Sequence, residues 1–454
     1  MSDTSTEKTA LVWFRQDLRI NDNPALHHAV SEGYHIIPLY IHDAEDADDW
    51  AHGEAADWWV FKSLQSLNES LGGKMAFRKG KARSTLEQIV DENDIAAIFW
   101  NRCYEPWRIA RDKDIKSILK DKGLEVETFN GSLLWEPWVP LKDDGTPYKV
   151  FTPFYRKGCL ERSPEPNKPL PSPKDISFAD FSPLYSENDI DLLPTIQWYR
   201  KFDQHWDVSE AGAKNQLDHF LQGGLKGYKE DRNRPDRDNV SRLSPYLKHG
   251  NISPRVVWHE ARTAGVARGV EKDMEHFCSE LGWREFSYSL LYHFPELPRE
   301  PLQEKFKNFP WDKDDGALEK WQKGLTGIPL VDAGMRELYE TGWMHNRVRM
   351  VVASVLVKNM LLHWHDGEDW FWDCLVDADL ANNSASWQWV AGCGADAAPY
   401  FRIFNAETQA TKFDPNFEYI KKWVPEFGTP DYPAPIVDLK ESRKKALEAY
   451  GEIK

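Results

Sequence analysis

Residues 11–26 read LVWFRQDLRINDNPAL, an apolar run followed by polar residues and, after Asn23-Pro24, the start of an amphipathic helical pattern. The apolar run, Ala10–Phe14, predicts a strand. Two more apolar runs follow, at His35–Ile41 and Ala96–Trp100. A second helical pattern lies between them, at Ala56–Leu71. Strands that alternate with helices predict a parallel α/β sheet at this end of the chain.

Glycine-rich phosphate loops are missing from this region. No GxGxxG follows the first predicted strand, and no P-loop occurs in the chain. The sequence therefore does not support a dinucleotide held at the N-terminus of a helix.

The middle of the chain is rich in proline. Eleven of the 28 prolines lie between Pro137 and Pro194, a density that prevents long regular elements. This segment is predicted to be a long, partly ordered linker.

From about Trp198 onward the pattern is helical, without convincing strands. One predicted helix face carries Val348, Val351, Val352 and Val355. Gly342 fits a stop for the preceding helix. The most apolar window, Met350–Trp364, is too short to span a bilayer and is predicted to be a buried helix. A mostly α region therefore follows the α/β region.

The composition is typical of a globular protein, since 41% of the 454 residues are apolar and 29% are charged. Residues 1–8 lack the basic start and apolar stretch of a secretory signal, so a cytoplasmic protein is expected. The five cysteines are widely spaced, which predicts free thiols rather than a disulfide framework or a metal knuckle.

The formal net charge is −16, and such a field repels nucleic acid, so a DNA partner would require a local basic surface. Tryptophan is abundant, and nine of the 21 indoles lie between residues 283 and 389. A large core explains any single indole. Their clustering favours an additional role.

Hydrolytic and metal-dependent chemistry lacks its sequence patterns. No GxSxG or HExxH occurs. His363 and His365 are two apart, which on a helix directs them about 200° from each other and prevents them from binding one ion. No metal site is predicted.

Two helical segments carry polar and aromatic residues at helical spacing. Glu280, Trp283 and Arg284 fall on one predicted helix face, and Asn346 and Met350 fall on another beside Arg349. The simplest alternative is a polar helix edge with ordinary ion pairs. Together these residues could line a pocket for a flat heteroaromatic ligand with phosphates.

The segment 377–389, DADLANNSASWQW, adds to this pocket. Trp387 and Trp389 are two apart, so one could face an internal cofactor and the other a cleft. Asp377 and Asp379 precede the helix, and their charges require partners in an interior. Arg349 is the natural partner.

These motifs closely resemble the photolyase/cryptochrome flavoprotein family over nearly the whole chain, and most of all its bacterial cyclobutane pyrimidine dimer (CPD) photolyases. Residues 11–26 are similar to its N-terminal signature. Its flavin-domain signatures follow in order as SRLSPYLKHGNISPR, LGWREF, TGWMHNRVRM, DADLANNSASWQW and DAAPYFRIFN. The resemblance implies a Rossmann-like α/β antenna domain (1–132), a Pro-rich connector (133–197) and an all-α FAD-binding catalytic domain (198–454).

The resemblance implies a U-shaped FAD among the C-terminal helices. The residues that match its phosphate-side contacts are Tyr228, Ser241, Arg242, Leu243, Ser244 and Arg284. Asp377, Asp379 and Arg349 match residues near the isoalloxazine. Asn383 matches the position opposite flavin N5, where an amide adapts to either protonation state. Signalling relatives often carry another residue type there, so Asn383 favours repair.

Three tryptophans match the family's electron-transfer chain, from the flavin to the surface: Trp387, Trp364 and Trp311. Electron tunnelling decays exponentially with distance, so a relay of oxidisable rings allows a buried flavin to be reduced from solvent. For each indole alone, ordinary packing is the alternative.

The resemblance implies a deoxyribodipyrimidine photolyase, a carbon-carbon lyase driven by blue light, in which photoexcited reduced FAD lends an electron to a flipped-out dimer. Trp283 and Trp389 match the indoles that hold the dimer, which extrudes more readily than an intact pair. Glu280, Asn346 and Met350 match the residues that make polar and thioether contacts with the dimer. Arg232, Arg347 and Gln409 match residues that contact the DNA near the dimer. A CPD is preferred to a (6-4) photoproduct because a histidine-rich pocket is missing.

A cryptochrome-like photoreceptor is one alternative, and a non-photochemical flavoprotein or Trp-rich binding module is another. The stretch after Trp423 is short and offers no long effector tail. Repair is therefore expected rather than signalling. The expected partner is UV-damaged DNA, either single- or double-stranded. The protein is expected to be a monomer and not to associate with a membrane. From Lys226 to Glu260 eight Lys and Arg outnumber five Asp and Glu, which offers a modest basic surface.

Three positions depart from the family pattern. Val240 stands where relatives commonly carry a hydroxyl residue, and Ala406 stands where a proline is expected. The region Tyr104–Arg108 lacks the Asn-Glu pair of folate-binding relatives. The sequence therefore leaves the identity of a second antenna chromophore open between a folate such as methenyltetrahydrofolate and a deazaflavin.

Overall fold

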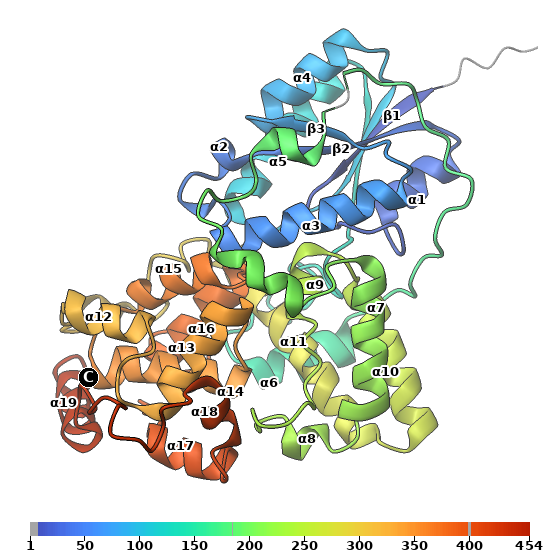
Figure 1. Cartoon of the computed structure of the whole chain (residues 1–454). Helices are drawn as coiled ribbons and strands as arrows, with labels where there is room; N and C mark the ends of the chain where they lie inside the picture. Colours follow the sequence, from blue (N-terminus) through green and yellow to red (C-terminus); the bar gives the residue numbers. More distant parts are fainter. Residues whose placement is uncertain (1–7, 184, 398–400) are drawn as a thin grey trace, which may run out of the picture.

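The computed structural model describes residues 8–183, 185–397 and 401–454. The N-terminal segment 1–8 was predicted not to be a secretory signal, and residues 1–7 of it lie outside the described residues. Ala398–Tyr400 of the DAAPYFRIFN motif also lie outside them. An α/β layer at the N-terminal end rests on a helical body (Figure 1). No helix in the described part of the chain has the length and apolarity needed to span a bilayer.

The α/β layer contains five parallel strands in the order β3-β2-β1-β4-β5. Their bounds are β1 Thr9–Phe14, β2 His35–His42, β3 Ala76–Lys79, β4 Ala97–Asn101 and β5 Glu125–Phe129. In the central register, Leu11 of β1 lies opposite Ile37 of β2 and Ile98 of β4. The predicted parallel α/β sheet is confirmed. Two strands were not predicted: β3 has only four residues, and β5 alternates polar side chains along the sheet edge.

Helices cover both faces of the sheet, which explains why β1 is apolar at every position after Thr9. Ala10, Val12 and Phe14 pack with α1 (Pro24–Ser31) and α3 (Glu54–Ser70). Leu11 and Trp13 pack with α4 (Ala82–Glu92) and α5 (Pro106–Asp121). Two short helices, α2 (Ala44–Ala47) and the 3₁₀ turn η1 (Asp48–Trp50), precede α3.

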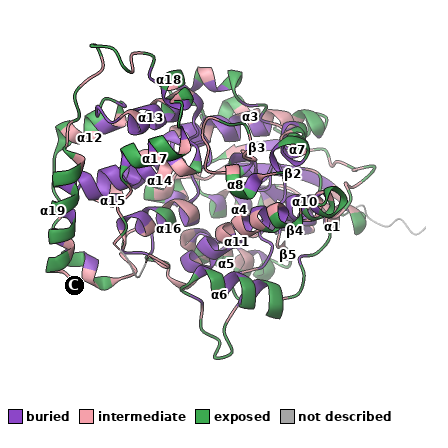
Figure 2. Ribbon diagram, turned by 90° about the horizontal axis from the view of Figure 1, so that it is seen from below, coloured by how far each residue is buried: buried purple, intermediate pink, exposed green. Residues whose placement is uncertain are grey.

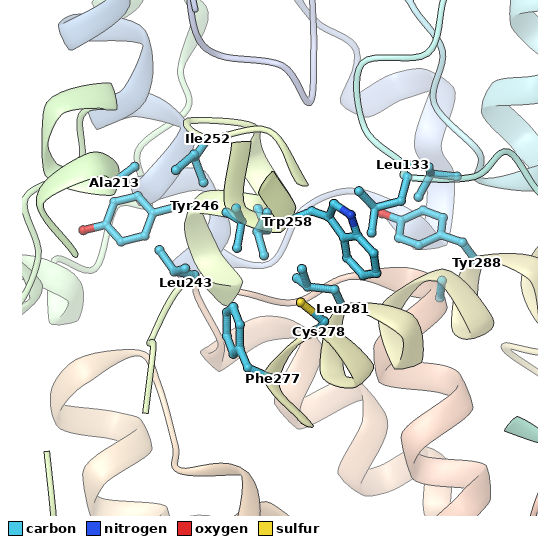
Figure 3. Packing of buried hydrophobic residues seen from close by; sticks show 14 of the residues in the cluster. Leu133, Ala213, Leu243, Tyr246, Ile252, Trp258, Phe277, Cys278, Leu281 and Tyr288 are labelled. Atoms are coloured by element: carbon cyan, nitrogen blue, oxygen red, sulfur yellow. The ribbon is translucent and has the colours of Figure 1, made fainter. Parts of the chain in front are cut away.

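The connector is mostly irregular, as its proline content predicts. Its regular pieces are α6 (Phe151–Pro153), the π-helix η2 (Phe154–Arg162) and the 3₁₀ turn η3 (Glu187–Ile190). Its beginning is buried, because Leu133 shares one core cluster with Trp258 and Tyr288 of the helical body (Figure 3). The connector is therefore packed against the helices at that point.

The helical body contains no strand among its described residues. Its elements are η4 (Trp198–Gln204), α7 (Glu210–His219), η5 (Phe220–Gly224), α8 (Tyr228–Asp231), α9 (Ser244–His249), α10 (Pro254–Arg268), α11 (Glu271–His293), η6 (Glu304–Asn308), α12 (Asp315–Gln322), α13 (Pro329–Thr341), α14 (Asn346–Ser354), η7 (Val355–Asn359), α15 (Trp364–Cys374), α16 (Leu380–Ala391), α17 (Ala406–Phe413), α18 (Glu418–Trp423) and α19 (Leu439–Glu452). Purple buried faces run through this body between green exposed ones (Figure 2).

The predicted stop at Gly342 is confirmed, since this residue caps α13 with φ 68°. The single helix predicted for Met350–Trp364 is wrong. The chain leaves α14 through the π-helix η7, breaks at Leu361 with φ 56°, and restarts as α15 at Trp364. A left-handed residue cannot continue a right-handed helix.

The α/β layer is joined to the helical body at the carboxyl ends of β1 and β4. There Asn101 donates to the Asp17 carboxylate at 2.6 Å and to Asn23 at 2.8 Å, while Arg19 donates to Gly250 O at 3.0 Å. Gly250 has φ +77°, and a Cβ there would overlap the backbone of residues 16 and 17. In open α/β sheets this crevice commonly binds ligands, but here the chain's own polar groups occupy it.

Candidate functional site

A buried ion pair lies between α14 and the turn before α16. Arg349 donates twice to Asp377, at 3.1 and 2.8 Å. Ser244, at the start of α9, donates to the same carboxylate at 2.6 Å and accepts from Trp343 Nε1 at 3.2 Å. Asp377 is only 8% exposed, so its charge is met by a guanidinium and a hydroxyl. Three predicted cofactor residues thus form one network.

Asp379 belongs to a different set of contacts. Its carboxylate caps α16 by accepting from Asn382 N at 2.8 Å, and it also accepts from the Tyr288 hydroxyl. The prediction that Arg349 serves both aspartates is therefore correct only for Asp377. The N-cap geometry turns Asp379 toward the helix start instead.

Arg284 lies on α11 and is turned toward Tyr288. Its guanidinium binds Glu285 at 3.0 Å and lies 4.9 Å from the Tyr288 ring. Glu285 also accepts from the backbone N–H groups of Leu134 and Trp135, at 2.8 and 3.1 Å. Burial raises the pKa of Glu285 to about 7. These bonds tie the start of the connector to the predicted cofactor side of α11.

Arg242 has a left-handed backbone with φ 49°. Its guanidinium lies between the indoles of Trp206 and Trp343, 4.7 and 4.8 Å from their centroids. Its Nε is buried without a hydrogen-bond partner among the described residues, and burial lowers its pKa. Ser241 precedes it and accepts from Gln216 through its backbone carbonyl at 2.9 Å.

Tyr228 and Leu243, two further residues on the predicted phosphate side, belong to one apolar cluster. Tyr228 packs edge-on against Phe220 and Phe277, at 5.4 and 5.6 Å. Burial raises the pKa of its hydroxyl. Both residues are therefore part of the core, and their FAD contacts stay a prediction.

Asn383 lies on α16 and donates from Nδ2 to the backbone carbonyl of Glu368 at 3.0 Å. The Glu368 carboxyl is 1% exposed, and neither of its oxygens has a hydrogen-bond partner among the described residues. Burial raises its pKa to about 8. Our sequence analysis missed Glu368. The sequence pattern that could have identified Glu368 is its spacing. It lies one helical turn after Trp364 and three residues before Phe371, which places an acid on a buried helix face.

Two of the predicted electron-transfer residues lie on helices, Trp387 on α16 and Trp364 on α15, whereas Trp311 lies in the loop between η6 and α12. Trp387 is buried and packs against Phe371 with centroids 5.1 Å apart. Trp364 is also buried, whereas Trp311 is half-buried. The His363 ring lies between these two indoles, 5.8 Å from Trp364 and 5.2 Å from Trp311. Sequence reasoning did not assign His363 to this region, and the relay itself stays a prediction.

The geometric argument that separated His363 from His365 is wrong. His363 is the N-cap of α15, and its Nδ1 accepts from His365 N at 3.1 Å. The two ring centroids are 4.4 Å apart. An N-cap residue does not follow the helical 100° step, so the two rings meet on one side.

On the predicted lesion side, Glu280 and Arg232 bind each other. The arginine donates to both carboxylate oxygens, with Nη2 to Oε2 at 2.8 Å, and it also contacts His276 at 3.1 Å. Burial raises the pKa of Glu280, although Arg232 opposes this shift. The prediction gave these residues separate contacts, with the base and with the DNA backbone. The structure brings them together.

Three predicted lesion contacts lie at the start of α14. Asn346 is exposed, Met350 is half-buried, and Arg347 donates to Asn233 Oδ1 at 3.1 and 2.7 Å. Arg347 also lies 4.8 Å from the Phe413 ring. The first five residues of one helix therefore carry all three, and only Asn346 is exposed.

The remaining predicted lesion contacts are Trp283, Trp389 and Gln409, and all three are half-buried. Trp283 stacks on Phe151 of the connector, with centroids 3.8 Å apart. Trp389 lies 5.5 Å from the Arg402 guanidinium, whereas Trp387 is buried in the core. That one indole faces a cofactor and the other a cleft stays a prediction.

Several buried polar atoms near these residues lack partners among the described residues, which fits a bound polar ligand such as FAD. They include Arg242 Nε, both amide atoms of Asn239 and His345 Nε2. His345 Nδ1 accepts from Arg347 N at 3.2 Å, and burial beside three arginines lowers its pKa to about 3. Its ring is therefore neutral and carries its proton on Nε2.

Comparison with known proteins places these residues in a family. The family profile for DNA photolyase matches residues 10–174, and the profile for the FAD binding domain of DNA photolyase matches residues 277–430. The deoxyribodipyrimidine photo-lyase of Agrobacterium fabrum is 43% identical over 98% of this chain and 99% of its own. The chain belongs to the photolyase/cryptochrome family. The resemblance read from the motifs is confirmed.

Similarity to other photolyase/cryptochrome members also extends over nearly the whole of this chain. The crystal structure of a bacterial class III photolyase from Agrobacterium tumefaciens has a TM-score of 0.93 and 41% identity, covering 100% of this chain and 99% of that one. Cryptochrome-1 of Arabidopsis thaliana is 34% identical over 98% of this chain and 70% of its own. The FAD-binding profile covers α11 to α18, which carry most of the predicted site.

Proposed function

We propose that this chain is a deoxyribodipyrimidine photo-lyase that repairs cyclobutane pyrimidine dimers in DNA by a light-driven electron transfer. The full-length similarity to the Agrobacterium fabrum enzyme supports this activity. The observation that carries the proposal is the double role of α14. Arg349 on this helix binds Asp377 on the predicted cofactor side, while Arg347 binds Asn233 on the predicted DNA side. The two arginines are two residues apart on this helix, so their side chains leave it in directions about 200° apart.

The cofactor side would hold FAD through residues already in place. Arg349, Asp377 and Ser244 offer a fixed set of donors and acceptors, and Arg242 offers an unpartnered donor for a phosphate. Asn383 presents a neutral amide. When bound in its reduced form, FAD supplies an electron donor that light can excite.

On the DNA side, Arg232 and Glu280 would separate when DNA binds. A backbone phosphate competes with the Glu280 carboxylate for the guanidinium of Arg232. Burial already raises the pKa of Glu280, and loss of its cationic partner raises it further. A protonated Glu280 would donate a hydrogen bond to the pyrimidine carbonyl where negative charge develops.

The proposal includes a relay through Trp387, Trp364 and Trp311, which would carry electrons from the surface to the cofactor side. The half-buried Trp311 is its outer end. The proposal also includes a cytoplasmic monomer that accepts single- or double-stranded DNA. Near the predicted antenna region, Arg108 and Arg111 lie over the Trp107 ring, at 4.6 and 5.0 Å.

The decisive experiment illuminates the purified protein, with its flavin reduced, in the presence of dimer-containing oligonucleotides. Recovery of thymine absorbance under light and not in darkness supports the proposal. An oligonucleotide with a (6-4) photoproduct distinguishes the related repair activity. Loss of the light response with both lesions would favour a cryptochrome-like photoreceptor, and the absence of flavin binding would remove both functions.

A further inference from the structure

Phe151, in the connector, stacks face to face on Trp283 of α11. Their centroids are 3.8 Å apart and their planes differ by 9°. This is the shortest ring separation among the described aromatic pairs. The two residues lie far apart in the sequence, so the contact depends on how the connector folds back on the helical body.

The Phe151 ring is itself held on several sides. Tyr155, one turn later, lies parallel to it at 5.6 Å, and Phe286 meets both Phe151 and Trp283 edge-on, at 6.0 and 5.9 Å. Tyr155 lies directly on α11 at Gly282, where a Cβ would overlap its ring. Phe151 is 9% exposed. Its position is therefore set by packing rather than by a free rotamer.

An indole has two faces, and Phe151 covers one face of Trp283. The indole is nevertheless half-buried rather than buried, so part of its surface stays open. Glu280, one turn earlier on α11, is held by Arg232. The indole and the carboxylate thus keep a fixed relative orientation before any substrate arrives.

Resting on the proposed function, we propose that Phe151 is a positioning residue for lesion recognition. It holds the Trp283 indole with one face available to the flipped-out dimer. Fixing a binding side chain beforehand lowers the entropy lost on binding. The connector therefore takes part in recognition through a ring that does not itself touch the dimer.

The test measures dissociation constants for dimer-containing and undamaged oligonucleotides of one sequence with the flavin-loaded enzyme. Phe151→Met keeps a long, flexible apolar side chain but removes the flat face, and it is expected to weaken dimer binding between about two- and tenfold, the range for an aromatic pair. Binding of undamaged DNA should not change. Phe151→Tyr should restore dimer affinity. The matched control is Phe99→Leu, which removes a fully buried ring from β4 of the α/β layer and should leave the ratio of the two constants unchanged.

A double-mutant cycle decides whether Phe151 acts through Trp283. Added to Trp283→Ala, Phe151→Met should have no further effect on dimer binding. Equal effects in both backgrounds, or equal losses for damaged and undamaged DNA, would overturn the inference. If Phe151→Met does not fold, Tyr155→Leu replaces it, because this variant loses the ring behind Phe151. An unaltered dimer affinity in Tyr155→Leu would overturn the inference. A loss of affinity for dimer-containing DNA alone would support the inference. If Trp283→Ala itself binds the dimer normally, the proposed lesion pocket is wrong instead.

Discussion

Arg349 holds Asp377 through two parallel hydrogen bonds, from Nη1 to Oδ1 at 3.1 Å and from Nη2 to Oδ2 at 2.8 Å. Both groups lie at the end of the site that is predicted to hold the isoalloxazine. The planar guanidinium fits the carboxylate on two atoms, which an ammonium cannot do. This pair therefore orients α14 against the turn before α16.

Arg349→Lys should release FAD more readily. Each hydrogen bond between charged groups contributes about 1.5–3 kcal/mol, so loss of one predicts about a tenfold or larger increase in the FAD dissociation constant. The rise of flavin fluorescence on dilution measures this constant. Arg347→Lys, two residues earlier and turned toward Asn233, is the matched control and should retain FAD. Equal release from both variants would contradict the assignment.

Trp387→Phe should abolish photoreduction of oxidised flavin, because the substituted ring is harder to oxidise and interrupts the relay. Repair should persist when the flavin is reduced chemically. Flavin absorption during illumination measures the first property, and thymine absorbance measures the second. Loss of both properties would mean that Trp387 supports the fold rather than the relay.

Arg232 and Glu280 should have different effects on DNA binding. Arg232→Gln removes a phosphate contact, so damaged and undamaged DNA should both bind more weakly, and the slope of log affinity against log salt should shrink by about 1. Glu280→Leu frees the arginine and removes the hydrogen-bond donor, so undamaged DNA should bind at least as well while dimer repair declines. Affinities measured at several salt concentrations test both statements. A common salt slope for wild type and Arg232→Gln would argue against a phosphate contact.

Glu368 predicts a pH-dependent stability. Its pKa is raised from the ordinary value of 4.5 to about 8 by burial, so between these values the folded chain keeps a proton that the unfolded chain has released. Stability is therefore lost as pH rises through this window, by about 1.4 kcal/mol per pH unit. In Glu368→Gln this contribution disappears. Urea unfolding from pH 5 to 9 should show a stability advantage of the variant that grows up to about pH 8 and then levels. A constant difference would mean that the carboxyl is ionised throughout.

Much of the fold could be read from local patterns. The residues of the apolar run Ala10–Phe14 are neighbours in the sequence, and so are the valines on one face of α14. The periodicity of each pattern reflects which side is buried. The edge strand β5 was missed because its outward residues are polar. The break at Leu361 was missed because nothing in an apolar window marks a left-handed residue.

The ordered motifs were enough to assign the family, and the comparisons confirm it. They also named residues that the structure gathers, such as Arg349 with Asp377. They did not reveal that Arg232 is bound to Glu280, or that the buried Glu368 carboxyl has no hydrogen-bond partner among the described residues. Those facts depend on which helices meet, and a sequence motif carries no distance between helices.

The sequence by itself determined the order of an α/β layer before a helical body, the chemical types in the site and the spacing of residues along each helix, because these properties are set by neighbours within one or two turns. Only the tertiary structure decided which charges pair, which acid is shielded from water and which ring covers Trp283. Contacts such as Phe151 with Trp283 join residues on distant segments, and chain closure, packing and desolvation act over that separation together.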